Sequence, residues 1–143
     1  ARKMEVNDNV MPSSNSSLAK GLFYLGTYLD NEAYLTLSKG MLNNVQEYIS
    51  KYGSAYSNWS LLMLHQVFPF YEVAVSGKEL KAKVAEINRT YVPNKLLIGS
   101  MGDSDLPLLE FKYTEGETRI YVCVNKSCKL PVTEVAEALK QID

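Results

Sequence analysis

The chain carries two cysteines, Cys123 and Cys128, in the stretch "IYVCVNKSCKLPVTEVAEAL" near its end. Two thiols with four residues between them could bind a metal ion, act as a redox pair or simply pack in a core. A zinc site usually needs four ligands, and the one histidine of the chain, His65, is distant in sequence. A thioredoxin-type pair has only two residues between its cysteines, at the start of a helix, so the spacing here differs.

We therefore interpret both cysteines as structural residues, with no metal and no cofactor. Cys123 is expected to be a small buried residue of a strand, and Cys128 is expected to pack where that strand leads into the following helix. A weakly activated thiol stays open as an alternative, because Cys128 precedes a predicted helix by a few residues. The chemistry of this stretch therefore depends on how the two thiols are placed.

A second group of candidates lies in the polar segment "NDNVMPSSNSS", which precedes a predicted helix. Small hydrogen-bonding side chains in such a loop can line a polar cavity or bind the hydroxyl groups of a sugar. They can equally cap the helix, with Asn15 or Ser16 as the N-cap. We predict Asn9, Ser13 and Asn15 as ligand-binding residues, while the catalytic residues stay unknown because no acid–base pair stands out.

The composition narrows the classes of protein that the chain could represent. Its 143 residues include fifteen basic and sixteen acidic side chains, which give a net charge of −1. This balance offers no attraction to a nucleic-acid backbone, and no run of about eighteen apolar residues predicts a membrane span. Two cysteines do not form a disulfide scaffold, so we expect a reducing compartment and a cytoplasmic protein.

The first half of the chain is expected to be helical. Apolar residues recur at helical spacing in three stretches, within residues 18–29, 34–49 and 59–67. Gly53 is predicted to cap the second helix at its C-terminal end. The links between these stretches are short, which predicts antiparallel helical hairpins.

The second half alternates strands with helices. The runs "EVAVSG", "NKLLIGS" and "TRIYVCV" are typical of strands, and "KELKAKVAEINRTY" and "PVTEVAEALKQI" are typical of helices, the last capped by Thr133. A strand, a helix and a strand with short links predict a parallel βαβ unit. The predicted fold is mixed α and β, with helical hairpins in residues 1–69 followed by a small three-stranded β-α-β-β-α module in residues 70–143.

Two stretches resemble segments of a known family. The run "NDNVMPSSNSSLAKGLFYLGTYLDNEAYL" resembles its "N-x-x-PSGNS-x-A…L-x-x-L" segment, and "YVPNKLLIG" with "YVCVNKSCKLPVTE" resembles its "YLPNK … YVC-x₄-C-x-x-PVTD" ending. The family is that of the thioredoxin-domain-containing proteins of the spermatogenesis-associated protein 20 type, which includes YyaL-like bacterial proteins. The resemblance covers nearly the whole chain, and Ser14 stands where the family usually has glycine.

The resemblance implies that the chain is the C-terminal part of a longer protein, in which a thioredoxin-like domain precedes an (α/α)₆ toroid similar to those of sugar epimerases and six-hairpin glycosidases. Residues 1–69 would be the last helices of this toroid, with Ser13, Ser14 and Asn15 at its inner mouth near a carbohydrate-like ligand. The implied partners are the rest of the chain and a small carbohydrate, with no nucleic acid and no membrane. We also expect a homo-oligomer through exposed helical faces of residues 16–67. The segment would be inactive alone, and the alternative functions are a non-catalytic binding or scaffold module and a thiol-redox accessory protein.

Overall fold

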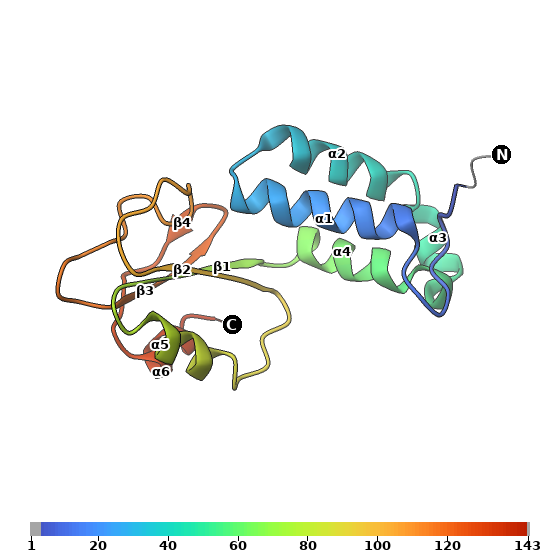
Figure 1. The fold of residues 1–143 in the computed structure, drawn as a ribbon. Coiled ribbons are helices and arrows are strands. Elements are labelled where there is room, and N and C mark those ends of the chain that lie inside the picture. Colours follow the sequence, from blue (N-terminus) through green and yellow to red (C-terminus); the bar gives the residue numbers. More distant parts are fainter. Residues whose placement is uncertain (1–3, 143) are drawn as a thin grey trace. The chain divides into compact units, whose positions relative to one another are not determined.

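The computed structural model describes residues 4–142, which form two compact units, the first ending at Phe68 and the second beginning at Pro69 (Figure 1). The first unit is helical, and the second contains a four-stranded sheet. The prediction of a mixed α and β fold is therefore confirmed. Within residues 4–142, no helix is long and apolar enough to cross a membrane.

The described part of the first unit contains four α-helices and one short 3₁₀ helix. These are α1 (Ser14–Tyr28), α2 (Glu32–Asn43), α3 (Gln46–Lys51), η1 (Gly53–Tyr56) and α4 (Ser57–Val67). Helix α1 lies between α2 and α4 (Figure 1). Asn31 begins α2 as its N-cap, since its side-chain oxygen accepts the backbone N–H of Tyr34 at 3.2 Å.

Small residues allow α1 and α2 to approach each other closely. The buried face of α1 carries Ser16, Ala19 and Gly26, and a Cβ atom at Gly26 would lie 2.7 Å from the side chain of Leu35. The hydroxyl of Ser38 in α2 donates to the carbonyl oxygen of Ala19 at 2.7 Å. Three leucines that predicted α1 by their spacing consequently lie exposed: Leu18, Leu25 and Leu29.

The second predicted helix proves to be two helices. It was expected to run to a cap at Gly53, but α2 ends at Asn43 and Gly53 instead begins η1. The N–H of Val45 donates to the carbonyl of Leu42 at 3.0 Å, three residues back rather than four, which tightens the chain at the break. Val45 and Ile49 both lie in the core, so the apolar spacing continues across the break and conceals it.

The core of the first unit combines residues from all of its helices. Its buried members are Ala19, Leu42, Val45, Ile49, Tyr56, Trp59 and Leu62. Trp59 is 1% exposed and Leu62 is fully buried, as the apolar face predicted for the last helix of this half requires. Val67, the last residue of the predicted stretch 59–67 and of α4, is exposed.

The second unit contains a mixed sheet whose strands are β1 (Tyr71–Ser76), β2 (Lys95–Ser100), β3 (Arg119–Val124) and β4 (Ser127–Cys128). Their order is β2-β1-β3-β4, with β1 parallel to β2, antiparallel to β3, and β3 antiparallel to β4. The parallel pair is joined by α5 (Leu80–Ile87), so the predicted βαβ unit is confirmed. The prediction of three strands is wrong, because the chain after β3 turns back to form the short strand β4.

The two faces of the sheet differ in character. Helices α5 and α6 (Val135–Leu139) lie on one face (Figure 1), where they cover an apolar core of Tyr71, Val73, Val75, Ile87, Ile120, Val122, Val135 and Ala138. Alternate residues of each strand point to the opposite face, which carries Glu72, Cys123 and Cys128. Thr133 was predicted to cap α6, but the N-cap is Glu134, without a side-chain hydrogen bond.

Candidate functional site

Cys123 and Cys128 are joined by a disulfide with an S–S distance of 2.07 Å. The interpretation of the two cysteines as separate packing residues is therefore wrong. Cys123 is 3% exposed within β3, in agreement with the prediction of a buried strand residue. Cys128 does not pack at the start of the following helix, because it is exposed and belongs to the edge strand β4.

A tight hairpin explains why the two cysteines meet. Asn125 and Lys126 form a two-residue turn between β3 and β4, with φ angles of 49° and 65°. Positive φ at both central residues is typical of a type I′ turn, whose twist matches that of antiparallel strands. The turn pairs Val124 with Ser127, and the next pair across the strands is Cys123 with Cys128, whose Cα atoms are 3.9 Å apart.

The sequence contained the signal for this bridge. In "CVNKSC" the cysteines stand symmetrically about Asn125 and Lys126, with one strand residue on each side. A two-residue hairpin turn at this place puts the two cysteines directly opposite each other. The comparison with zinc and thioredoxin sites considered only the number of residues between the cysteines, and it did not ask which turn could lie between them.

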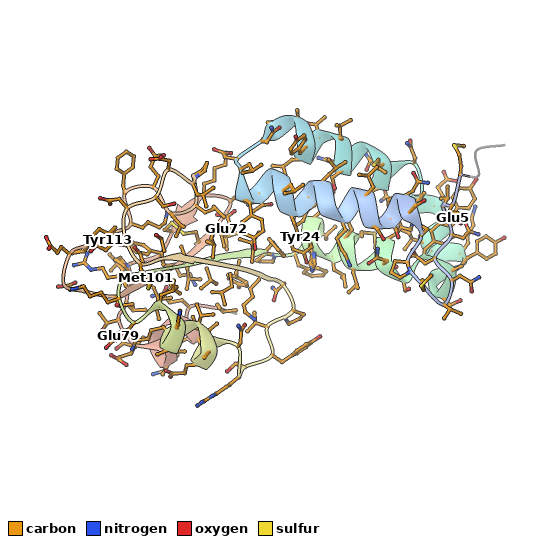
Figure 2. All side chains as sticks on the ribbon, viewed as in Figure 1. Glu5, Tyr24, Glu72, Glu79, Met101 and Tyr113 are labelled. Atoms are coloured by element: carbon orange, nitrogen blue, oxygen red, sulfur yellow. A yellow bond between two sulfur atoms is a disulfide. The ribbon has the colours of Figure 1, made fainter. Side chains whose placement is uncertain are left out.

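A buried carboxyl group lies beside the disulfide. Glu72 of β1 is paired in register with Cys123 of β3 and is 8% exposed. Its Oε2 accepts a hydrogen bond from the backbone N–H of Lys126 at 3.2 Å, so the side chain extends along the sheet toward the hairpin turn. Figure 2 labels Glu72 near the start of β1. Glu72, Cys123 and Cys128 thus form a row across three neighbouring strands.

This row can support thiol–disulfide chemistry. A disulfide accepts two electrons when a thiolate attacks one of its sulfur atoms, and exposed disulfides are reduced more readily than buried ones. Cys128 is accessible because it is exposed on an edge strand of two residues. Sequence analysis missed Glu72, although one charged residue in the otherwise apolar run "YEVAV" was a signal. Among residues 4–142, no group of three or more His, Cys, Asp or Glu side chains is placed to hold a metal ion.

The residues predicted to bind a ligand lie at the start of α1. Ser13 is buried and is the N-cap of α1, in place of the predicted Asn15 or Ser16, since its Oγ accepts the N–H of Ser16 at 3.1 Å. The Nδ2 of Asn15 donates to the carbonyl oxygen of Glu5 at 2.7 Å, and Asn9 is exposed. The polar segment therefore supplies a helix cap and local hydrogen bonds, and ligand binding by the three residues stays a prediction.

Asp8 is the centre of this polar segment, and sequence analysis did not identify it. Its Oδ1 accepts the N–H of Ser13 at 2.9 Å and the hydroxyl of Ser16 at 2.6 Å. Its Oδ2 accepts the N–H of Asn58 at 2.8 Å and that of Trp59 at 3.4 Å, in the first turn of α4. Burial raises the pKa of Asp8, but these hydrogen bonds together outweigh it and the pKa lies below its usual value. One carboxylate thus ties the starts of two helices together.

A polar cleft of about 340 Å³ lies elsewhere in the second unit. It is lined by Lys78, Glu79, Lys83, Gly116, Glu117, Thr118, Thr133 and Glu134. Three of its charged side chains pair within the unit: Lys83 lies 3.4 Å from Glu134, and Glu117 lies 2.7 Å from Arg119. Figure 2 labels Glu79 just beyond the end of β1, whereas Glu72 is near its start, so the cleft and the disulfide are separate sites.

The chain is similar in sequence to spermatogenesis-associated protein 20 from three mammals. The identity is 26% with the Homo sapiens protein, 25% with that of Mus musculus and 24% with that of Rattus norvegicus. Each match covers 97% of this chain and 19% of the relative, so the chain spans about a fifth of the length of these curated relatives. No protein-family model and no solved structure matches the chain. The relationship expected from the two sequence stretches is confirmed.

Proposed function

We propose that the second unit acts as a thiol–disulfide redox module, in which Cys123 and Cys128 alternate between a disulfide and two thiols. The observation that carries this proposal is an accessible disulfide on the edge of a sheet whose apolar core lies on the other face. Reduction takes two electrons and two protons. They come from a dithiol protein or from two molecules of a thiol such as glutathione.

The placement of the disulfide favours reversible reduction. Neither cysteine belongs to the apolar core formed by β1, β3, α5 and α6. The bridge closes a ring over a sequence separation of only five, so its removal should lower the free energy of unfolding by only about 2 kcal/mol. The ladder between β1 and β3 pairs six residues of each strand through the backbone, and the bridge adds no contact to it. The unit is therefore expected to stay folded in both redox states.

The compartment expected from the composition agrees with this function. In reducing compartments, disulfides that do form are usually transient, and they serve catalysis or redox sensing rather than stability. A cytoplasmic location of this chain is a proposal from its composition, with two cysteines in 143 residues. In such a compartment, a bridge with one exposed cysteine would exchange with the thiol pool.

A redox titration tests the proposed function. The chain is equilibrated in buffers of reduced and oxidised glutathione, free thiols are trapped with an alkylating reagent, and the mass of the intact protein is measured. We expect both thiols to be trapped together, and the midpoint potential of the cysteine pair to lie above about −300 mV, the value below which structural disulfides typically lie. A bridge that stays closed at and below that potential in native buffer would contradict the proposal, as would two thiols that never close.

The control for this titration is the variant Cys123→Ser with Cys128→Ser. It removes both reactive sulfur atoms and should show no change of mass across the titration. Circular dichroism of the wild-type chain at both ends of the titration reports whether the unit stays folded. If reduction occurred only together with unfolding, the disulfide would be structural and the redox function would be excluded.

A carbohydrate-related function is a second candidate, implied by the family resemblance and not by any contact in the structure. It would use Asn9, whose side chain is exposed, together with Ser13 and Asn15 at the start of α1. Because the chain spans 19% of its relatives, the activity, ligands and partners of a whole protein are proposals. Titration calorimetry with neutral monosaccharides on the chain and on Asn9→Ala tests this candidate; heat that is the same for both would exclude a role for Asn9.

A further inference from the structure

We infer that the two sulfur atoms have separate roles: Cys128 exchanges with the redox partner, and Cys123 only closes the bridge. This inference rests on the proposed redox function. It starts from the difference in placement of the two residues. Cys123 is 3% exposed in β3, which is flanked on both sides by other strands, whereas Cys128 is exposed in β4 at the edge of the sheet.

The neighbours of the two cysteines strengthen this difference. Cys123 is paired across the strands with Glu72 of β1 on one side and with Cys128 of β4 on the other. Glu72 is 8% exposed and accepts the N–H of Lys126, so a second buried side chain lies beside Cys123 on the same face of the sheet. Cys128 belongs to the last strand of the order β2-β1-β3-β4 and is exposed. An incoming thiolate therefore reaches Cys128 more readily than Cys123.

Reduction then follows one order. A partner thiolate bonds to the Sγ of Cys128, the bond between Cys128 and Cys123 breaks, and its electron pair goes to the Sγ of Cys123. The proton that the partner thiol lost passes through water to Cys123, which becomes a thiol. A second partner thiolate attacks the partner sulfur of the mixed disulfide and releases Cys128 as a thiolate, which takes up the second proton. Oxidation runs through the same steps in reverse.

Single-cysteine variants test the assignment, with oxidised glutathione as the probe. In Cys123→Ser only Cys128 can form a mixed disulfide, and in Cys128→Ser only Cys123 can do so. We expect Cys128 to be modified at least about tenfold faster than Cys123 in native buffer, because burial restricts access to Cys123. Equal rates, or faster modification of Cys123, would overturn the assignment. So would a tenfold difference that persists in concentrated urea, since folding would then not be its cause.

Glu72 gives a second, matched test. Replacing Glu72 by Ala opens the approach to Cys123, so Glu72→Ala in the Cys128→Ser background should raise the rate of modification of Cys123 several-fold. The same substitution in the Cys123→Ser background should leave the rate at Cys128 unchanged. If Glu72→Ala changed both rates alike, a general loosening of the sheet would explain the effect and the blocking role of Glu72 would be refuted.

The wild-type chain provides a measurement that needs no substitution. The reduced protein is exposed to a short pulse of iodoacetamide, and the labelled peptides are identified by mass spectrometry. Label at Cys128 before Cys123 supports the assignment, and label at Cys123 first contradicts it. Failure of the redox function is distinguishable, because the glutathione titration of the wild-type chain would then show no reversible reduction. A reversible titration with equal labelling would refute only the separate roles.

Discussion

Two buried carboxyl groups, Asp8 in the first unit and Glu72 in the second, lie in opposite kinds of surroundings. Both oxygens of Asp8 accept hydrogen bonds from groups of its own unit, at the starts of α1 and α4. Glu72 lies in a row with a disulfide whose outer cysteine is exposed. The comparison teaches that burial of an acid does not by itself indicate chemistry; what decides is whether a reactive, accessible group lies beside it.

The largest effect on stability is expected at Asp8. Asp8→Asn removes the charge and puts an amide donor where backbone N–H groups need an acceptor, so we expect a loss of about 3 kcal/mol in the free energy of unfolding. Urea unfolding followed by the fluorescence of Trp59, the one tryptophan of the chain, measures it in the first unit. The control is Asp103→Asn, an exposed aspartate of the second unit, which should stay within about 0.5 kcal/mol of the wild type. If Asp8→Asn left the free energy of unfolding unchanged, the stabilising role of Asp8 would be contradicted.

The same carboxylate should make the first unit sensitive to acid. The pKa of Asp8 is lower in the folded chain than in the unfolded chain, so its stabilisation is present above the unfolded pKa of about 3.9 and is lost as the pH falls through the folded pKa. We expect the free energy of unfolding, measured from pH 6 to pH 2 with Trp59 fluorescence, to fall more steeply for the wild type than for Asp8→Asn. Parallel curves for the two proteins would contradict the lowered pKa.

Removal of the disulfide is expected to have a smaller effect. In the variant with Cys123→Ser and Cys128→Ser, the second unit should lose about 2 kcal/mol, because the bridge closes only a short ring. Urea unfolding monitored by far-ultraviolet circular dichroism measures this loss. Complete unfolding of the second unit in this variant would show that the bridge is structural. The contrast between a structural group at Asp8 and a reactive group beside Glu72 would then be wrong.

The smallest effect is expected at the helix cap. Ser13→Ala removes the oxygen that accepts the N–H of Ser16, at a cost of about 1 kcal/mol. Its matched control is Ser14→Ala, the exposed first residue of α1, which should be nearly neutral. Thermal unfolding of both variants measures these losses of stability. If Ser13→Ala costs much less than Asp8→Asn, the carboxylate of Asp8 stabilises the segment more than the helix cap does.

The sequence predicted the elements better than the contacts between them. The helical period of apolar residues predicted α4, and apolar runs predicted the strands β1 and β2, since both signals are local. The hydrogen bond from Asn58 to Asp8 joins residues fifty positions apart, and no local pattern encodes such a pair. The disulfide was encoded locally, in the turn between Cys123 and Cys128, but a hairpin turn with Lys126 at positive φ lacks the usual glycine. The leucines of α1 predicted the helix correctly but not its buried face, which is formed by small residues.

Hydrogen exchange of the oxidised and reduced chain, followed by mass spectrometry in native buffer, tests most directly whether the disulfide can react without loss of the fold. The account predicts that reduction speeds exchange only in the hairpin of β3 and β4, around Asn125 and Lys126. The amides of β1 and β2, which pair with each other over their whole length, should keep their protection. Loss of protection across β1 and β2 on reduction would contradict the account, since the bridge would then support the whole sheet.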